Sequence, residues 1–219
     1  MTKIFRLNKK INPFNKKISI PGDKSLSIRW VLLASQAEGP SKAYNLLMSA
    51  DVIAAIDSLK KLGIKIKINK NCCEIFGNGI NGFKYKKNLI INAKNSGTLG
   101  RLILGLLIKS PEKIKLIGDK SLSKRDFSRV TRPLEKFGAK FYYKKKNKLP
   151  LSILGSQSAK GINYLENKGS AQCKSSVMLA SLNASGTTYI KAKKSRNHSE
   201  LIFKYLKIPT KIKKTKKYD

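Results

Sequence analysis

The sequence predicts an α/β fold built from three copies of one β-α-β-α-β-β unit. Two internal echoes predict the repeat: LKKLGIKIKI at residues 59–68 is echoed by LEKFGAKFYY at 134–143, and VLLASQAEG at 31–39 by VMLASLNASG at 177–186. The first pair is 75 residues apart and the second 146, or two periods of 73. Both the sequence motifs and their spacing recur, so a chance alternation of helices and strands is disfavoured.

Each unit begins with a short strand, expected at residues 17–20, 88–92 and 162–166. A Gly/Ser-rich turn and an apolar helix follow, and the next strand is expected at 42–46, 113–117 and 187–191. A second helix and one or two alternating strands complete the unit. The three repeats cover about 17–80, 81–157 and 158–219, and the third has room for only one final strand, so it is truncated.

The chain has 219 residues, of which 41% are hydrophobic, and its 47 basic and 12 acidic residues give a net charge of +35. This excess suggests an anionic partner. Most lysines, however, alternate with apolar residues in runs such as KIKIK, which is typical of the solvated face of strands. The arginines instead cluster in or beside Gly/Ser-rich stretches, at Arg29, Arg101, Arg125, Arg129, Arg132 and Arg196.

Cysteine and histidine are scarce. The three cysteines include the adjacent pair Cys72 and Cys73, and His198 is the single histidine. These residues form neither a disulfide framework nor a zinc pattern, so we expect a reduced protein without metal or cofactor. The longest apolar run, LILGLLI, is far shorter than the ~20 residues that span a bilayer. We therefore expect a cytoplasmic protein that does not enter a membrane.

The first helix of each unit opens with small, polar or basic residues, in GDKSLSIR, KNSGTLGR and GSAQCKSS. Helix N-termini present unpaired N–H groups and the positive end of the helix dipole, and small residues let an anion approach them. Capping alone explains one polar residue per helix. It does not explain Lys24 with Arg29, Arg101, or Lys174 beside Gln172, so we expect the three helix starts to converge on one anionic ligand.

Five stretches carry a resemblance to a known family. PGDKSLSIR, NSGTLGR, GDKSLSKRDFSRVTRPLEKFGA, SAQCKSSVMLASL and SRNHSELI resemble, in order and spacing, the signatures of the 5-enolpyruvylshikimate-3-phosphate synthases. The resemblance implies one domain of the inside-out α/β barrel of enolpyruvyl transferases, in which each of two domains has three such units. The chain resembles the N-terminal half. Residues 17–219 then form the shikimate-phosphate-binding domain, and residues 1–16 belong with the second domain.

By the same resemblance, the chain takes part in carboxyvinyl transfer from phosphoenolpyruvate to the 5-hydroxyl of shikimate 3-phosphate. Lys24 is implied to contact both substrates and to assist proton transfer. The residues implied to bind shikimate 3-phosphate are Lys24, Ser25, Arg29, Ser170, Ala171, Gln172 and Arg196. Those implied to bind phosphoenolpyruvate are Lys24, Asn95, Gly97, Arg125 and Gln172.

The sequence departs from the family pattern at two positions near these residues. Asp126 stands where a proline usually follows the arginine, and Lys94 stands where a glycine usually precedes the asparagine. We expect Asp126 to weaken the field around Arg125, and Lys94 to alter the approach of the turn to a ligand.

The family's acidic proton-transfer groups fall in its second half. For Asp23, Asp51, Asp119 and Glu200 we expect turn or capping roles, and for His198 a position at a helix N-terminus. The chain is therefore expected to be a half enzyme, inactive alone, with a separate C-terminal half chain as a potential partner.

Three alternatives remain at this point. A related transferase acting on a UDP-sugar shares the fold, but GDKS and SAQxKS disfavour it. A basic nucleic-acid-binding protein is supported only by charge, and such binding would be non-specific and sensitive to salt. A purely structural repeat protein leaves the clustered arginines unexplained.

Overall fold

The computed structural model describes residues 6, 8–70, 72–213 and 215–218. Its elements follow the three sequence repeats. The first unit contains α1 (Lys24–Ala34), β1 (Glu38–Tyr44), α2 (Ala50–Lys61), β2 (Lys65–Ile68) and β3 (Cys72–Asn78). The second contains β4 (Ile90–Asn92), α3 (Gly97–Leu106), β5 (Ile114–Ile117), α4 (Lys120–Ser123), α5 (Ser128–Lys136), β6 (Lys140–Tyr143) and β7 (Leu151–Leu154). The third contains β8 (Asn163–Glu166), α6 (Ala171–Ser181), β9 (Tyr189–Ala192) and α7 (His198–Tyr205).

Each unit builds one sheet. The strand orders in the described residues are β1-β3-β2, β4-β5-β7-β6 and β8-β9. The two strands that flank the first helix of a unit pair in parallel, as β4 with β5 and β8 with β9. The strand after that helix pairs antiparallel with the last strand of its unit, as β1 with β3 and β5 with β7. The expected α/β class is confirmed, and the second unit has the expected order with α4 as an additional short helix.

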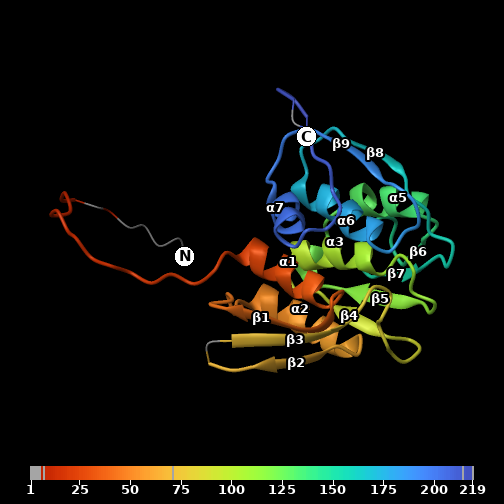
Figure 1. Cartoon of the computed structure of the whole chain (residues 1–219), viewed down its shortest axis with the longest axis horizontal. Coiled ribbons are helices and arrows are strands. Elements are labelled where there is room, and N and C mark those ends of the chain that lie inside the picture. Colours follow the sequence, from red (N-terminus) through yellow and green to blue (C-terminus); the bar gives the residue numbers. More distant parts are fainter. Residues whose placement is uncertain (1–5, 7, 71, 214, 219) are drawn as a thin grey trace.

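The strand expected at residues 17–20 is wrong: these residues form no strand, and residues 8–20 extend away from the body (Figure 1). Just after this segment, the Gly22 N–H donates a backbone hydrogen bond to the Asn45 carbonyl oxygen at 3.1 Å. No further backbone hydrogen bond joins residues 17–20 to a neighbouring strand in the described part of the chain. Ile18 and Ile20 remain 80% and 69% exposed. The apolar alternation that predicted the strand therefore buries no face in this chain, and without burial an isolated extended segment is not held in a sheet.

The third unit also differs from the expectation. Among the described residues after α7, no strand forms, and residues 206–213 are turn and coil. One isolated antiparallel bridge joins Lys193 to Tyr218. The expected final strand is therefore wrong beyond this single bridge.

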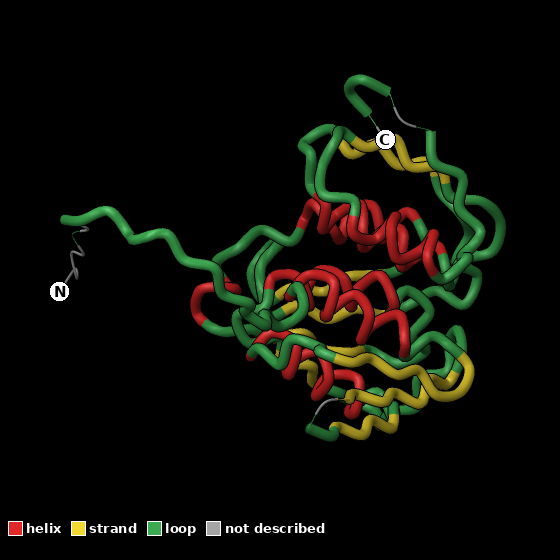
Figure 2. Tube along the Cα trace, turned by 60° about the vertical axis from the view of Figure 1, so that its left-hand side comes forward, coloured by secondary structure: helices red, strands yellow, loops and turns green. Residues whose placement is uncertain are grey.

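The helices occupy the interior and the sheets lie outside them (Figure 2). Apolar side chains of α1, α2, α3 and α6 fill the core, and α3 and α6 pack so closely that a Cβ on Gly105 would lie 2.2 Å from the Ser176 carbonyl oxygen. This contact requires glycine. None of the helices within the described part of the chain has the length and apolar character to cross a membrane.

Candidate functional site

The start of α1 is fixed by its own side chains and by the loop after β1. Asp23 accepts a hydrogen bond from the Leu26 N–H at 2.8 Å and caps the helix, as expected. A Cβ on Gly22 would lie 2.7 Å from the Asn45 carbonyl oxygen, so the turn needs glycine. The exposed Lys24 ammonium lies 3.3 Å from the Asp51 carboxylate. The segment PGDKS thus holds a cation at the N-terminus of α1, with Ser25 half-buried beside it.

The start of α3 is tied to α4. Ser96 accepts from the Leu99 N–H at 3.2 Å, and the Asn95 side-chain amide donates to Asp119 at 2.5 Å. Asp119 also caps α4 through the Leu122 N–H, at 2.7 Å. These hydrogen bonds hold the pKa of Asp119 below its ordinary value, the bond from Leu122 contributing most. The carboxylate is therefore ionised and positions Asn95 at the helix start.

Two guanidinium groups converge on Gly97, the first residue of α3. A Cβ at this position would lie 2.8 Å from Arg101 Nη1 and 2.9 Å from Arg125 Nη1. Burial lowers the pKa of Arg101, and Arg125 lowers it further as a nearby like charge. An anion beside Gly97 would relieve this repulsion. The sequence pointed to Arg101 as a basic residue at a helix start that capping does not explain, but did not assign it to either substrate.

Gln172 joins the starts of α3 and α6. Its side-chain oxygen accepts from Arg101 Nη1 at 2.8 Å, and its amide nitrogen donates to Thr98 Oγ1 at 3.0 Å. Ser170 caps α6 by accepting from the Cys173 N–H at 3.3 Å. Ser170 and Ala171, at the cap and the first position of α6, are half-buried next to Gln172. The structure thus brings together the predicted residues of the second and third units.

Arg29 connects α1 with α6 and α7 and is only 3% exposed. Its Nε donates to Ser199 Oγ at 2.9 Å, its Nη2 to Ser175 Oγ at 2.8 Å and its Nη1 to the Ser25 carbonyl at 3.0 Å. Burial lowers the pKa of Arg29. These bonds use three of the five guanidinium N–H donors among the described residues, and through them Arg29 orders the three helices.

These contacts place the helix starts around one region. Arg29, Ser175, Arg101, Gln172 and Ser199 all lie in the first two turns of their helices. The exposed Arg196 precedes α7, and its charge lowers the pKa of Arg29. The N-terminal dipole ends of α1, α3 and α6 therefore face a common, cationic area.

The acidic residues near this area have structural partners. Asp126 accepts a hydrogen bond from the Ser128 N–H at 2.6 Å, which lowers its pKa most, and the nearby charges of Arg132 and Arg101 lower it further. It therefore supports the first turn of α5. Glu200 forms a buried ion pair with Lys174 and Asp51 pairs with Lys24, so these two carboxylates are not capping residues as expected. His198 is the first residue of α7, as expected.

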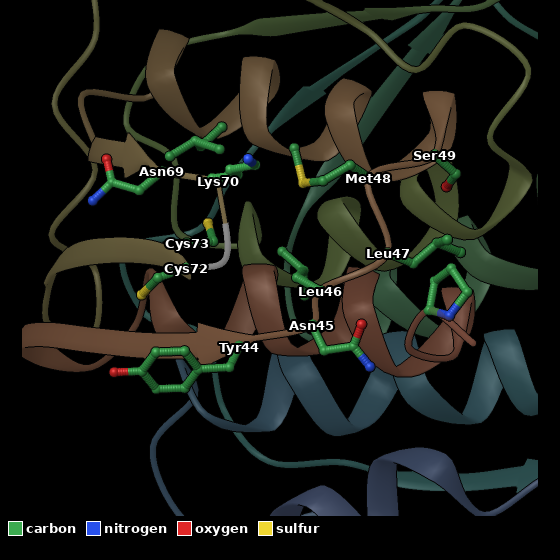
Figure 3. Close-up of a pocket in the computed structure, with 12 residues that line it drawn as sticks. Tyr44, Asn45, Leu46, Leu47, Met48, Ser49, Asn69, Lys70, Cys72 and Cys73 are labelled. Carbon is green, nitrogen blue, oxygen red and sulfur yellow. The ribbon is translucent and has the colours of Figure 1, made fainter. Parts of the chain in front are cut away.

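A separate cavity of about 600 Å³ lies between the loop after β1 and the start of β3 (Figure 3). Apolar and small polar side chains line most of it, and Lys70 is its charged residue. The cysteines Cys72 and Cys73 at its wall are free. The arginines gather at the helix starts, and none of them lines this cavity.

This fold and this cationic area define an α/β domain of three repeated units with arginines gathered at its helix starts. The chain belongs to the EPSP synthase family: the family model for EPSP synthase (3-phosphoshikimate 1-carboxyvinyltransferase) matches residues 8–218. The resemblance read from the sequence motifs is thereby confirmed, and the alternative interpretations are not favoured.

Individual relatives agree with the family match. The chain is 41% identical over 193 residues to the 3-phosphoshikimate 1-carboxyvinyltransferase of Bacillus subtilis (strain 168), covering 87% of this chain and 45% of the relative. It is 42% identical over 201 residues to that of Vesicomyosocius okutanii, covering 90% and 46%. The solved EPSP synthase of Acinetobacter baumannii superposes with a TM-score of 0.86 at 32% identity, over 93% of this chain and 46% of that one. The chain thus spans about half the length of these relatives.

Proposed function

We propose that this chain is the shikimate-3-phosphate-binding half of a cytoplasmic carboxyvinyltransferase. The enzyme transfers the enolpyruvyl group of phosphoenolpyruvate to the 5-hydroxyl of shikimate 3-phosphate and releases phosphate. This reaction belongs to the route to chorismate and aromatic amino acids. The observation that carries the proposal is the convergence of Arg101 and Arg125 on Gly97, with Gln172 bonded to Arg101 across two helix starts. Both substrates are polyanions, and such an area gathers their charges.

The assignment of ligands rests on the family resemblance, and the geometry of the helix starts is compatible with it. The area around α3 is suited to phosphoenolpyruvate, because its small turn and two guanidinium groups match a compact dianion. The start of α6, which Arg29 joins through Ser175, is suited to shikimate 3-phosphate. We assign Asn95, Gly97, Arg125, Gln172 and Lys24 to phosphoenolpyruvate, and Lys24, Ser25, Arg29, Ser170, Ala171, Gln172 and Arg196 to shikimate 3-phosphate.

The chemistry needs more proton carriers than this chain offers at the site. Addition removes a proton from the 5-hydroxyl and delivers one to the methylene carbon of phosphoenolpyruvate, and elimination takes one back as phosphate leaves. Asp51 and Glu200 are engaged by Lys24 and Lys174, and Asp119 and Asp126 by backbone N–H groups. Lys24 alone does not perform all three transfers, so we propose that the chain acts with a second polypeptide that supplies the other half.

The direct test is a titration of the chain with shikimate 3-phosphate, followed by two-dimensional amide NMR at moderate salt. We expect saturable shifts near Lys24, Ser170 and Arg196. Lys24→Met should weaken binding about tenfold or more by removing a charged hydrogen-bond donor. Lys42→Met is the matched control, because Lys42 is 56% exposed and lies 3.4 Å from Glu74, whereas Lys24 is 52% exposed and lies 3.3 Å from Asp51.

Three results would contradict the proposal. A dispersed spectrum that ignores the ligand would remove the site assignment. Equal losses in Lys24→Met and Lys42→Met would indicate binding by net charge alone, as would affinity that falls with salt as steeply as nucleic-acid binding does. Turnover by the isolated chain would remove the need for a second polypeptide.

A further inference from the structure

Glu166, the last residue of β8, is a buried acid just before the start of α6. It is only 4% exposed. The Ser170 N–H donates to its Oε2 at 2.7 Å. Its Oε1 accepts from the Lys168 N–H at 3.3 Å and from Arg129 Nη2 at 3.2 Å. Both carboxylate oxygens therefore hold the turn that leads from β8 into α6, and the Arg129 guanidinium compensates the charge.

The turn between β8 and α6 is fixed at both ends. At its beginning, the Lys193 N–H donates to the Glu166 carbonyl at 2.7 Å, which joins the ends of β8 and β9. At its end, Ser170 caps α6 and is bonded through its own N–H to the Glu166 carboxylate. Between them, Gly169 has a φ of +68°, a left-handed conformation that glycine adopts without strain. The start of α6 thus has little freedom to move.

The first turn of α6 carries the residues that we assign to shikimate 3-phosphate. Gln172 lies two residues after Ser170 and is bonded to two residues of α3. The Glu166 charge acts on the same helical turn: burial raises the pKa of the Cys173 thiol most, and the nearby carboxylate adds to that rise. A shift of the turn would therefore move the helix cap and Gln172 together.

An acid beside an anion site repels the ligand unless its charge is compensated. Arg129 of α5 provides the compensation, with a side chain that is 44% exposed against 4% for Glu166. Burial lowers the pKa of Arg101, and the charge of Arg129 contributes to that lowering, so Arg129 also lies near the cationic area. The ion pair lets a carboxylate order the turn without leaving net negative charge at the helix start.

We propose that Glu166 is a positioning residue for shikimate 3-phosphate. Its carboxylate fixes the turn at 167–170, so that Ser170, Ala171 and Gln172 meet the ligand in one arrangement. Arg129 neutralises this carboxylate and does not itself contact the substrate. The inference rests on the proposed function, because the ligand is the one assigned to the start of α6.

The first test replaces Glu166 by glutamine in the full chain. Glutamine keeps the size of the side chain but has one acceptor oxygen, so part of the turn loses its bond. We expect Glu166→Gln to weaken shikimate 3-phosphate about tenfold in an NMR titration. In the ligand-free chain it should speed amide hydrogen exchange at Lys168 or Ser170.

Glu74→Gln is the matched control. Glu74 is also a glutamate on a strand and in an ion pair, with Lys42 Nζ at 3.4 Å from its Oε1, but it lies on β3 in the sheet of the first unit. We expect this variant to change neither the affinity nor the exchange at Lys168 and Ser170. Equal effects of the two glutamine variants would overturn the proposal.

A double-mutant cycle with Arg129 separates positioning from direct contact with the ligand. Arg129→Met leaves the buried carboxylate uncompensated, and we expect a several-fold loss of affinity. In the Glu166→Gln background the same change should cost less than about twofold, because no charge remains to be neutralised. Equal losses in both backgrounds would mean that Arg129 contacts the ligand, and would overturn the proposal.

Two further measurements keep the outcomes apart. Thermal unfolding identifies a temperature at which the variants are folded, and the titrations are made there. If Glu166→Gln does not fold, Arg129→Met and Arg129→Lys remain, because the Arg129 side chain is half-exposed. Lysine keeps the charge and should lose less affinity than methionine, and equal losses would overturn the proposal.

Failure of this inference is distinguishable from failure of the proposed function. Absence of shikimate 3-phosphate binding to the unaltered chain would remove the proposed function. Unchanged amide exchange at Lys168 and Ser170 in ligand-free Glu166→Gln would overturn only the positioning role of Glu166.

Discussion

At the scale of single residues, the site depends on the absence of a side chain at Gly97. The two guanidinium nitrogens nearest to it, from Arg101 and Arg125, occupy the space that a Cβ would need. Arg101 is held by the Gly97 carbonyl at 3.1 Å and by the Phe127 ring, whose centroid lies 5.3 Å from its guanidinium carbon. Arg125 lies on an exposed turn and moves at lower cost.

Gly97→Ala should therefore displace Arg125 in particular and weaken phosphoenolpyruvate binding several-fold in the presence of saturating shikimate 3-phosphate. Stability should change by less than about 1 kcal/mol, because the clashing atoms are the ends of flexible side chains. Gly100→Ala is the control on the same helix: its Cβ would meet its nearest neighbours at 3.5 Å, an ordinary contact. Calorimetric titration measures the first effect, and a similar loss in both variants would contradict it.

Lys94, in the turn between β4 and α3, has a backbone conformation that disfavours any residue with a side chain. Its φ of +50° lies in the left-handed region, where a side chain is strained and glycine is not. This explains physically why a glycine is suited to the position that the sequence fills with lysine. The Lys94 N–H is nevertheless bonded to the Asn92 side chain at 2.8 Å, which holds the turn.

Lys94→Gly should raise the free energy of unfolding by about 0.5–1 kcal/mol, the relief of left-handed strain less the added entropy of the unfolded chain. Lys94→Ala should give no such gain, because alanine keeps the Cβ that causes the strain. Urea denaturation measures both. A gain in both variants would instead implicate the lysine charge in a strongly basic chain.

At the scale of elements, Arg29 joins three helices that are far apart in the sequence. Its fork bonds Ser199 of α7 and Ser175 of α6, and the Ser199 hydroxyl also donates to Ser175 at 2.7 Å. Arg196 lies just before α7 and is exposed. The two arginines therefore contribute differently. Arg29 holds the helix starts in place, and Arg196 adds positive charge to the surface that the helix starts present.

Arg29→Lys should lower the free energy of unfolding by about 2 kcal/mol, because lysine cannot reproduce the fork and leaves buried hydroxyls with fewer partners. Arg196→Lys should leave stability within about 0.5 kcal/mol yet weaken shikimate 3-phosphate several-fold, since a point charge replaces a bidentate donor. Thermal unfolding of both variants measures the change in stability, and NMR titration measures the change in shikimate 3-phosphate binding. Loss of stability in Arg196→Lys, with none in Arg29→Lys, would reverse the two assignments.

At the scale of the whole molecule, the body and the N-terminal segment differ in packing. The three sheets enclose a continuous helical core, whereas residues 8–20 leave it without secondary structure (Figure 1). Residues 1–5 and 7 of the expected N-terminal segment lie outside the described residues. We propose that this segment packs on the second domain.

Brief trypsin treatment should cut first after Lys9, Lys10, Lys16 and Lys17. A protease binds its substrate as a locally extended chain, and this segment is already extended. The product should retain the core and its thermal transition. A second polypeptide carrying the other half should slow these cuts. Resistance at residues 8–20 equal to that of the body would contradict the proposed place of the segment.

Much of the fold and part of the site were predictable from local patterns. The repeat, the helices and the capping of α1 by Asp23 depend on residues that are close in sequence, so short motifs such as GDKS indicated them. The ion pairs of Asp51 and Glu200 and the bond between Arg101 and Gln172 join residues from different turns or units, and no local signal revealed them. The strand expected at 17–20 failed for the same reason, because alternation specifies a strand only where a partner covers it.

The sequence by itself determined the class of this protein, its three units and the helix starts that carry small and basic residues, because propensity, capping and periodicity act over a few residues. The tertiary structure alone decided which charges meet: Arg29 with two serines from distant helices, and Arg101 with Gln172 beside Gly97. Such contacts depend on how the units pack around a shared core, and packing is a property of the whole chain.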